Sequence, residues 1–250
     1  MALPTDWFVP DWPAPACVRS LVTTRNGGVS TAPFDSMNLA DHVEDDPEAV
    51  RANRERLRAH LPAEPCWLRQ VHGTRVVEAG TAAAPEQADA CVARRAGKVC
   101  VVMIADCLPV LLCDRAGTTV AAAHAGWRGL SAGVLERTVA AMGCAPCELL
   151  AYLGPAIGPQ AFEVQVDVLE AFAQTHPHAR ACFQAKPTVA GTPRKWLADL
   201  YGLARQRLNS AGVRAIYGGD RCTFSEPATF YSHRRDGRTG RQAALIWLDA

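Results

Sequence analysis

The sequence predicts an α/β fold in which mixed β-sheets are layered with helices, and three features support this prediction. Short apolar runs of strand length recur along the 250-residue chain, and most are not followed by a helix, which argues against a regular Rossmann alternation. Four other segments have the apolar spacing of amphipathic helices. No repeat and no Ser/Gly-rich linker interrupts the chain, so we expect residues 1–250 to form a single domain.

The first half of the chain combines one helix with most of the strands. Asp46 is followed directly by proline, which is typical of a helix start, and Val50, Leu57 and Leu61 then lie on one face. The run at 99–105 is apolar on both faces, which indicates a central strand covered on each side. The expected strands of this half are residues 17–23, 66–71, 75–79, 99–105, 109–113 and 118–123.

The second half is expected to alternate between helices and strands. A helix at 130–142 is closed by Gly143, and a helix at 196–211 is stopped by Gly212, because glycine is a common residue just past a helix end. The loosest segment, residues 176–194, is rich in Pro, Ala and Thr and predicts a surface loop. The remaining expected elements are a helix at 166–175 and strands at 149–153, 213–217 and 243–248.

The bulk composition argues against several classes of partner. The net charge is +1 and no block of five like charges occurs, so neither nucleic acid nor an acidic membrane surface is indicated. The apolar stretch at 99–110 contains Asp106 and Pro109 and is too short to span a bilayer. The first residues do not combine a basic segment with an apolar one, so we expect no secretory signal and a cytoplasmic location.

Ten cysteines are spread through the chain. In a reducing compartment thiols stay free and serve as small buried side chains or as metal ligands. Cys91, Cys100 and Cys113 lie inside apolar runs, so we expect these three in the core.

Three segments place a histidine or cysteine where an apolar strand gives way to Gly or Pro. They are Gln70-Val71-His72-Gly73, Ala105-Asp106-Cys107-Leu108-Pro109 and His124-Ala125-Gly126-Trp127-Arg128-Gly129. A strand end fixes a side chain while the following loop leaves space beside it. Two histidines and one cysteine suit zinc, and three protein ligands leave a fourth position for water or substrate, as in catalytic sites. Asp106 is expected either to orient a ligating histidine or to cap the turn.

Further motifs extend along nearly the whole chain. They are Thr23-Thr24-Arg25-Asn26-Gly27-Gly28-Val29-Ser30, Ser36-Met37-Asn38-Leu39, His42-Val43-Glu44-Asp45-Asp46, Leu153-Gly154-Pro155, Phe162-Glu163-Val164, Asp199-Leu200, Cys222-Thr223, Tyr231-Ser232-His233-Arg234-Arg235 and Thr239-Gly240-Arg241. Together with the three strand-end segments, they resemble the successive signatures of the YfiH-like family, long called laccase-domain polyphenol oxidases. The chain departs from that pattern at His233, where an aromatic residue is usual, and at Glu44, which replaces a frequent glycine.

The resemblance implies a one-domain α-β-β-α sandwich with a metal bound by His72, Cys107 and His124. It also implies phosphorolysis of adenosine, inosine and methylthioadenosine, together with deamination of adenosine. We therefore predict a zinc-dependent purine nucleoside phosphorylase whose partners are purine nucleosides and phosphate. We expect it to work as a monomer.

Several further side chains are candidates for contacts with the substrates. Arg25 and Arg128 each lie in a turn flanked by glycine, where a guanidinium can bind an oxyanion through two hydrogen bonds. Asn38, His42 and Gln70 are candidate contacts to the purine base or the ribose. Zinc with an open position can activate water for attack on C6 of adenine. Phosphorolysis instead needs cations around the phosphate and a proton for the departing purine, whose donor the sequence does not identify.

Three other functions stay open. A Cys–His hydrolase, such as an amidase acting on a cell-wall precursor, would use Cys107 as nucleophile and one of the two histidines as base. The second is a non-enzymatic partner protein with a structural zinc, which would need a fourth protein ligand such as His42 or Cys222. Copper binds this ligand set at least as strongly as zinc, so a copper-dependent phenol oxidase is the third. A multicopper site, however, uses many paired histidines, whereas this chain has seven histidines and one such pair, His176-Pro177-His178.

Overall fold

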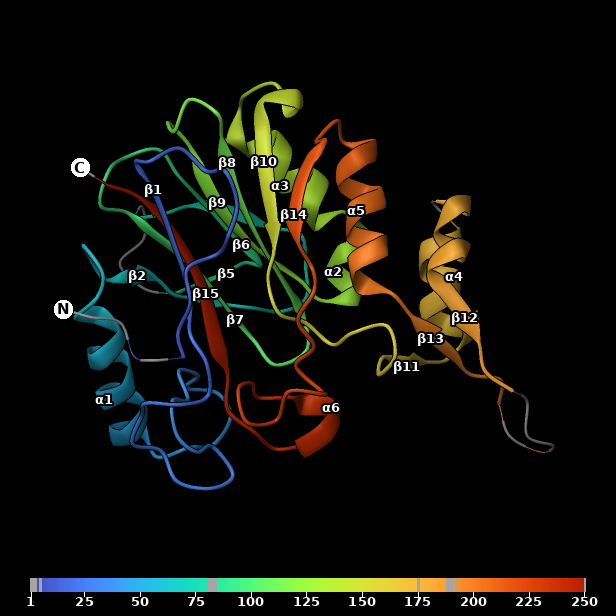
Figure 1. Cartoon of the computed structure of the whole chain (residues 1–250), viewed down its shortest axis with the longest axis horizontal. Helices are drawn as coiled ribbons and strands as arrows, with labels where there is room; N and C mark the ends of the chain where they lie inside the picture. Colours follow the sequence, from blue (N-terminus) through green and yellow to red (C-terminus); the bar gives the residue numbers. More distant parts are fainter. Residues whose placement is uncertain are drawn as a thin grey trace.

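Two β-sheets lie face to face at the centre of the fold (Figure 1). The computed structural model describes residues 4, 6–80, 85–174, 176–187, 191 and 193–249. The four-stranded sheet has the order β1 (Val18–Val22), β15 (Gln242–Leu248), β7 (Val99–Ile104) and β2 (Pro65–Cys66). The six-stranded sheet has the order β14 (Ala215–Gly218), β10 (Leu149–Leu153), β8 (Leu108–Asp114), β9 (Val120–Ala125), β6 (Ala90–Ala93) and β4 (Val76–Glu78). Each sheet contains both parallel and antiparallel pairs, as predicted.

Helices cover the outer faces of the two sheets. One helix, α1 (Pro47–Arg58), packs on the four-stranded sheet. The opposite face of the six-stranded sheet packs against α2 (Trp127–Ala132), α3 (Val134–Met142) and α5 (Leu200–Ser210). The layers therefore follow the order α-β-β-α, and the predicted sandwich is confirmed.

The burial of both strand faces explains the apolar runs in the sequence. Along β15, Leu245 and Trp247 pack on the α1 side, whereas Ala244 and Ile246 face the six-stranded sheet. Every residue of β7 is buried between β15 and β2, so the central strand expected at 99–105 is confirmed. Each fully buried Leu or Ile contributes about 1.5–3 kcal/mol, which makes this double layer the main source of stability.

The start of α1 agrees with its sequence signal. The Asp46 side chain accepts a hydrogen bond from the backbone N–H of Glu48 at 3.1 Å, and proline occupies the first turn. Val50 and Leu57 are buried under the helix, and Leu61 is buried just beyond its end. The thiols of Cys91, Cys100 and Cys113 are also buried in the core, as expected.

A single helix at 130–142 is wrong, because the chain forms two helices there. Gly133 has a φ of 99° and lies between α2 and α3. This left-handed conformation ends one helix and starts the next in a new direction. Gly143, with a φ of 73°, closes α3 as predicted.

The prediction for 196–211 is wrong at its start. Residues Trp196–Ala198 form strand β13, and α5 begins only after Asp199, whose side chain accepts from the N–H of Gly202 at 2.9 Å. Within the segment expected as a loop, η2 (Pro177–Cys182) and β12 (Phe183–Ala185) are ordered, because β12 pairs with β13. Residues 188–190 and 192 of that segment, and the expected helix end at 175, lie outside the described residues.

Other differences concern short strands. The run expected at 66–71 divides into β2 and β3 (Leu68–Arg69), and β3 pairs with β5 (Glu86–Gln87) in a separate two-stranded sheet. Strand β6 was not predicted, because its four residues are too few to show a period. A short helix, η1 (Pro146–Glu148), precedes β10.

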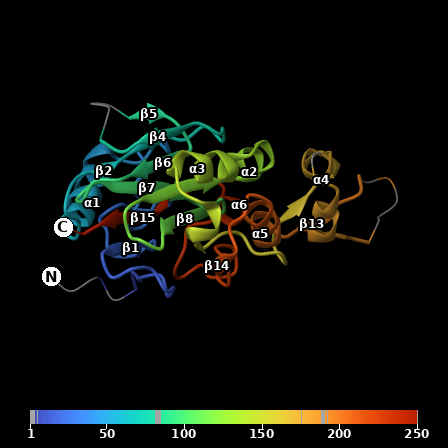
Figure 2. The same ribbon diagram turned by 90° about the horizontal axis from the view of Figure 1, so that it is seen from above.

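A lobe extends beyond α5, far from α1 (Figures 1 and 2). The lobe consists of β11 (Glu163–Val164), α4 (Val166–Ala173), η2, β12 and β13. Its elements β11 and α4 line one of the two cavities discussed below. None of the helices in the described residues is both long and apolar enough to cross a bilayer.

Candidate metal and substrate site

The three side chains predicted as metal ligands meet near the ends of β7, β8 and β9. His72 follows β3, Cys107 lies in the turn between β7 and β8, and His124 lies on β9. Nε2 of His72 lies 3.6 Å from Sγ of Cys107, and the two imidazole rings meet edge to face with centroids 4.8 Å apart. All three ligand atoms lie within 4.8 Å of one another, so a single ion can contact all of them.

The backbone around these side chains is unusual. His72 and Asp106 have positive φ values of 59° and 89°, a region that residues with a Cβ rarely adopt and that recurs at functional sites. Gly126 has no room for a side chain, because a Cβ there would lie 2.7 Å from Cδ2 of His72 and 3.0 Å from Sγ of Cys107. The site is therefore closely packed before any ligand binds.

A fully buried aspartate, Asp89, lies beneath the site and was not predicted from the sequence. Its Oδ1 lies 2.9 Å from Nδ1 of His124 and accepts the backbone N–H of His72 at 2.9 Å. Its Oδ2 accepts the N–H groups of Gly73 at 2.7 Å and Val71 at 3.2 Å. These contacts fix the ring of His124 through Nδ1 and leave Nε2 for a metal, as is usual for ligating histidines. The only signal in the sequence was an aspartate between two alanines.

Replacing Asp89 with asparagine is expected to weaken zinc binding about 10- to 100-fold, the usual effect of removing a carboxylate behind a ligating histidine. Competition with a zinc chelator measures this change. Asp114→Asn is the matched control, because Asp114 is also buried but accepts hydrogen bonds from Thr118 and Thr119 in a distant turn. Equal zinc affinity in the Asp89→Asn and Asp114→Asn proteins would contradict this role for Asp89.

The charges of the site suit a metal with nitrogen and sulfur ligands. Burial raises the pKa of Cys107, but the neighbouring His124 and His72 outweigh it and lower that pKa to about 6. Burial lowers the pKa of His124, whereas Cys107 and Asp89 raise it to about 9. Cys107 therefore favours the thiolate, which is the form that binds metals. His124, whose raised pKa favours the imidazolium, must release a proton to bind an ion through Nε2.

A pocket of about 380 Å³, here called the inner pocket, opens beside the three ligands. It brings the ligands together with the predicted substrate residues His42, Gln70 and Arg128. Its complete lining consists of His42, Gln70, His72, Met103, Ile104, Ala105, Asp106, Cys107, His124, Trp127, Arg128, Ile157, Phe162, His233, Arg234 and Arg241.

The three predicted residues differ in their freedom to bind a ligand. The Gln70 side chain donates to the carbonyl of Met103 and accepts its N–H, both at 2.8 Å, so this amide shapes the end of β7. The guanidinium of Arg128 lies over the ring of Trp127, 4.4 Å from its centroid, which holds the charge in place. His42 is 58% exposed at its side chain and contacts Asp41 at 3.5 Å.

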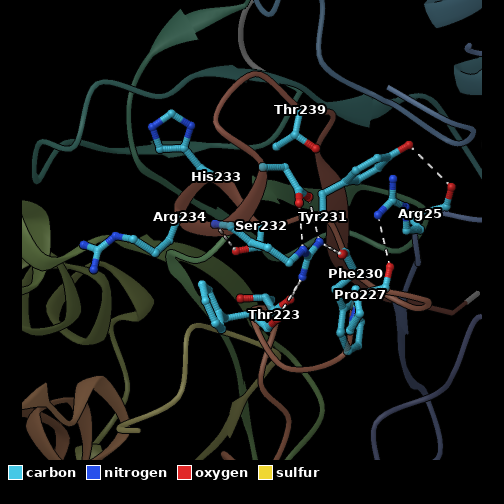
Figure 3. Close-up of polar contacts among 12 residues, drawn as sticks. Arg25, Thr223, Pro227, Phe230, Tyr231, Ser232, His233, Arg234 and Thr239 are labelled. Atoms are coloured by element: carbon cyan, nitrogen blue, oxygen red, sulfur yellow. Dashed lines mark hydrogen bonds and ion pairs between the residues drawn. The ribbon is translucent and has the colours of Figure 1, made fainter. Parts of the chain in front are cut away.

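Arg25 and Asn38 do not line the inner pocket. Arg25 donates to the carbonyls of Asp35 at 3.1 Å and Pro227 at 3.0 Å. Figure 3 shows Arg25 and Arg234 on opposite sides of the segment that contains Tyr231 and Ser232. The buried Asn38 donates to a backbone carbonyl and a carboxylate and accepts two backbone N–H groups. Both side chains fix local backbone in this structure.

Asp106 does not contact a ligating histidine. Its Oδ1 accepts the hydroxyl of Thr223 and its Oδ2 accepts the backbone N–H of Arg234, both at 2.6 Å. Arg234 lies in α6 (His233–Asp236), so Asp106 ties the turn of Cys107 to that helix. The alternative prediction, that Asp106 caps a turn, is closer to its observed role.

Arg241 was also missed as a site residue, although the Thr239-Gly240-Arg241 motif was noted. Its Nη1 donates to the carbonyls of Thr239 at 2.8 Å and Gly240 at 2.9 Å. Burial lowers the pKa of Arg241. The charges of Cys107 and Asp106 oppose this effect, and the guanidinium presents a partly desolvated positive charge to the inner pocket.

The candidate metal group has three members in the part of the chain that the structure describes. His42 lines the same pocket but lies outside this group. The sulfur of Cys222 accepts the N–H of Gly158 at 3.2 Å and is likewise not a member. The arrangement thus matches catalytic zinc sites, which keep one position open, and not closed structural sites.

Comparison with known proteins places this site in a family. A family model described as multi-copper polyphenol oxidoreductase laccase matches residues 19–249. Purine nucleoside phosphorylase YfiH of Escherichia coli is 54% identical over 244 residues, which cover 96% of this chain and 98% of the relative. The chain belongs to the YfiH family.

Other YfiH family members support the same assignment. A purine nucleoside phosphorylase of Pseudomonas aeruginosa is 57% identical over 242 residues, covering 97% of this chain and 98% of the relative. The crystal structure of a Neisseria meningitidis protein has a TM-score of 0.93 and 53% identity, and covers 98% of this chain and all of that one. YlmD from Geobacillus stearothermophilus has a TM-score of 0.86 and 30% identity, covering 100% and 98%.

Proposed function

We propose that this chain is a zinc-dependent purine nucleoside phosphorylase that acts on adenosine, inosine and methylthioadenosine and also deaminates adenosine. The observation that carries the proposal is that one pocket joins the His72, Cys107 and His124 group to three guanidinium groups, those of Arg128, Arg234 and Arg241. The names of two relatives, both purine nucleoside phosphorylases, support the phosphorolysis of purine nucleosides.

Three ligands and one aspartate that orients a ligand form the metal side of the pocket. When bound, zinc would supply Lewis-acid chemistry next to the substrate. His72, Cys107 and His124 would hold the ion, and Asp89 would keep the ring of His124 in its ligating orientation. The donor set fits zinc, since it consists of two imidazole nitrogens and a favoured thiolate.

The anion side of the pocket is supplied by arginines. In phosphorolysis the bond from C1′ to the purine nitrogen breaks, a bond from C1′ to a phosphate oxygen forms, and the purine leaves with a proton. We assign the phosphate to Arg128 and Arg241, because both line the inner pocket and both are held by neighbouring groups. The sequence predicted Arg25 for this role, but Arg25 lies outside the pocket, so we assign the role to Arg241 instead.

The remaining walls suit a purine. Trp127 and Phe162 contribute aromatic faces, and Met103, Ile104 and Ile157 contribute apolar surface. Of the residues predicted to contact the base or the ribose, His42 is the one that is both in the pocket and exposed, so we assign it a contact to the nucleoside.

Adenosine incubated with the enzyme, with and without phosphate, tests the proposal. Adenine and ribose 1-phosphate are expected only with phosphate, whereas inosine is expected in both reactions, because deamination consumes water alone. Mass spectrometry of the products separates the two reactions. Adenine release that ignores phosphate would indicate hydrolysis and overturn the phosphorylase assignment.

Two subsidiary proposals concern the whole chain. We propose that residues 1–250 form one domain, because β1 near the start pairs with β15 near the end along five residues. We also propose a monomer in the cytoplasm, where all ten cysteines, which are free in the structure, would stay reduced.

A Cys–His hydrolase is the second candidate, because Cys107 contacts His72 and has a lowered pKa. A cell-wall precursor amide would then be the substrate. Chelation distinguishes the two functions, since removing zinc would abolish the phosphorylase and free Cys107 for hydrolysis and for alkylation by iodoacetamide.

Phenol oxidation is expected to be slow and to depend on added copper. The described residues provide one three-ligand group, whereas multicopper chemistry needs several copper ions. Oxygen uptake with a phenol, measured for zinc-loaded and copper-loaded protein, checks this expectation. Rapid turnover by a copper-free preparation would be incompatible with it.

A further inference from the structure

A second cavity of about 520 Å³, here called the outer pocket, adjoins the inner pocket. The two share four wall residues: Trp127, Arg128, Phe162 and Arg234. The other walls come from the lobe, namely Glu163, Val164, Gln165, Asp167, Val168 and Lys195. The two pockets therefore lie next to each other along these four side chains.

The shared wall carries two guanidinium groups that are held in place. Arg128 lies over the ring of Trp127 at 4.4 Å, and Arg234 lies over the ring of Phe162 at 5.4 Å. Nη1 of Arg234 also donates to the carbonyl of Glu163 at 2.7 Å. Because these contacts restrict both side chains, less conformational entropy is lost when they bind an anion.

The lobe adds a lysine whose charge is only partly compensated. The Glu163 carboxylate pairs with Lys195 at 2.6 Å and with Lys186 at 2.5 Å, and these hydrogen bonds lower its pKa to about 2. One carboxylate is thus shared by two ammonium groups, and only Lys195 of the two lines the outer pocket. Asp167 is the other acidic residue in the wall, so the outer pocket carries an excess of positive charge.

We infer that the outer pocket is a subsite for a phosphate ester on the ribose, so that purine nucleoside monophosphates are also substrates. This inference rests on the proposed function, because the purine and the ribose would occupy the inner pocket. A phosphate monoester carries a charge of about −1.5 to −2 near neutral pH, which suits Arg234 and Lys195, while Arg128 stays with the inorganic phosphate of the inner pocket. In the reaction the C1′ bond to the purine breaks and a C1′ bond to inorganic phosphate forms. The purine takes a proton, and the ester stays on the sugar, giving a ribose bisphosphate.

The test compares adenosine with adenosine 5′-monophosphate and adenosine 3′-monophosphate in four proteins: wild type, Lys195→Met, Lys186→Met and Asp167→Asn. Binding is measured by calorimetry, and kcat/KM by purine release with phosphate. We expect at least one ester to bind more tightly than adenosine and to be cleaved, and which ester it is identifies the ribose position. Lys195→Met should weaken the binding of that ester about five- to tenfold, since a hydrogen bond to a charged group is lost. The binding and cleavage of adenosine should be unchanged.

The other two variants give the controls. Lys186 pairs with the same Glu163 carboxylate but does not line the outer pocket. The preference for the ester over adenosine should therefore persist in Lys186→Met. Asp167→Asn removes a negative charge from the wall and should strengthen ester binding. Failure of both esters to bind better than adenosine, or equal losses for ester and adenosine in Lys195→Met, would overturn the subsite. Ester binding that depends on Lys195, in a protein that never releases purine, would uphold the subsite and reject the proposed function.

Discussion

Replacing Cys107 with alanine is expected to remove the bound zinc and to reduce purine release and adenosine deamination to the level of a protein-free control. The thiolate is one of three ligands, and two histidines alone bind zinc far more weakly. His72→Ala should have the same effect. Metal content per chain, measured by inductively coupled plasma mass spectrometry alongside product formation, checks both variants.

The fold should survive these substitutions. The two sheets and their helices bury a core that does not include the metal ligands, so Cys107→Ala should retain its far-ultraviolet circular dichroism and a cooperative unfolding transition. Cys222→Ala is the control, because Cys222 lies outside the metal group and should leave zinc content unchanged. Zinc loss in Cys222→Ala would indicate a closed structural site instead.

Replacing Arg241 or Arg128 with methionine is expected to separate the two activities. Loss of one charge-assisted contact to a buried anion costs about 3–4 kcal/mol, so phosphorolysis should fall by roughly two to three orders of magnitude. Deamination should fall much less, because no anion takes part in it. Adenine and inosine formed from the same adenosine reaction give both rates in one experiment.

Arg25→Met provides the comparison for these two variants. Its guanidinium lies outside the pocket and donates hydrogen bonds to the carbonyls of Asp35 and Pro227. This variant should therefore lose stability without changing the ratio of the two products. Equal losses of adenine and inosine in Arg241→Met and Arg128→Met would show that these arginines position the nucleoside or the fold. Their assignment to phosphate would then be withdrawn.

The sequence predicted the fold where a signal was local or strongly periodic. The cap at Asp46 and the doubly buried strand at 99–105 both agree with the structure. The error at 196–211 arose where tertiary pairing decided the outcome. Residues Trp196–Ala198 have a helical apolar pattern, yet they form a strand because β11 and β12 pair with them on both edges.

The candidate site was predictable only in part. The three ligands stand at strand ends next to Gly or Pro, which is visible in the sequence, whereas Asp89 shows its role only through contacts across the sheet. Arg25 and Arg241 illustrate the same limit for the anion site. Both lie near glycine in turn-like motifs, and only the folded chain shows that Arg241 faces the pocket while Arg25 is bound to backbone carbonyls outside it.

The presence of zinc on His72, Cys107 and His124 is tested most directly by anomalous diffraction at the zinc absorption edge from crystals of the purified protein. We expect one strong peak per chain, within bonding distance of both imidazole nitrogens and the Cys107 sulfur, about 2.0–2.3 Å in each case. The peak should border the inner pocket, and the fourth coordination position of the ion should be open to that space. A protein that is active on adenosine but shows no peak at these residues, or shows a fourth protein ligand on the ion, would contradict this account.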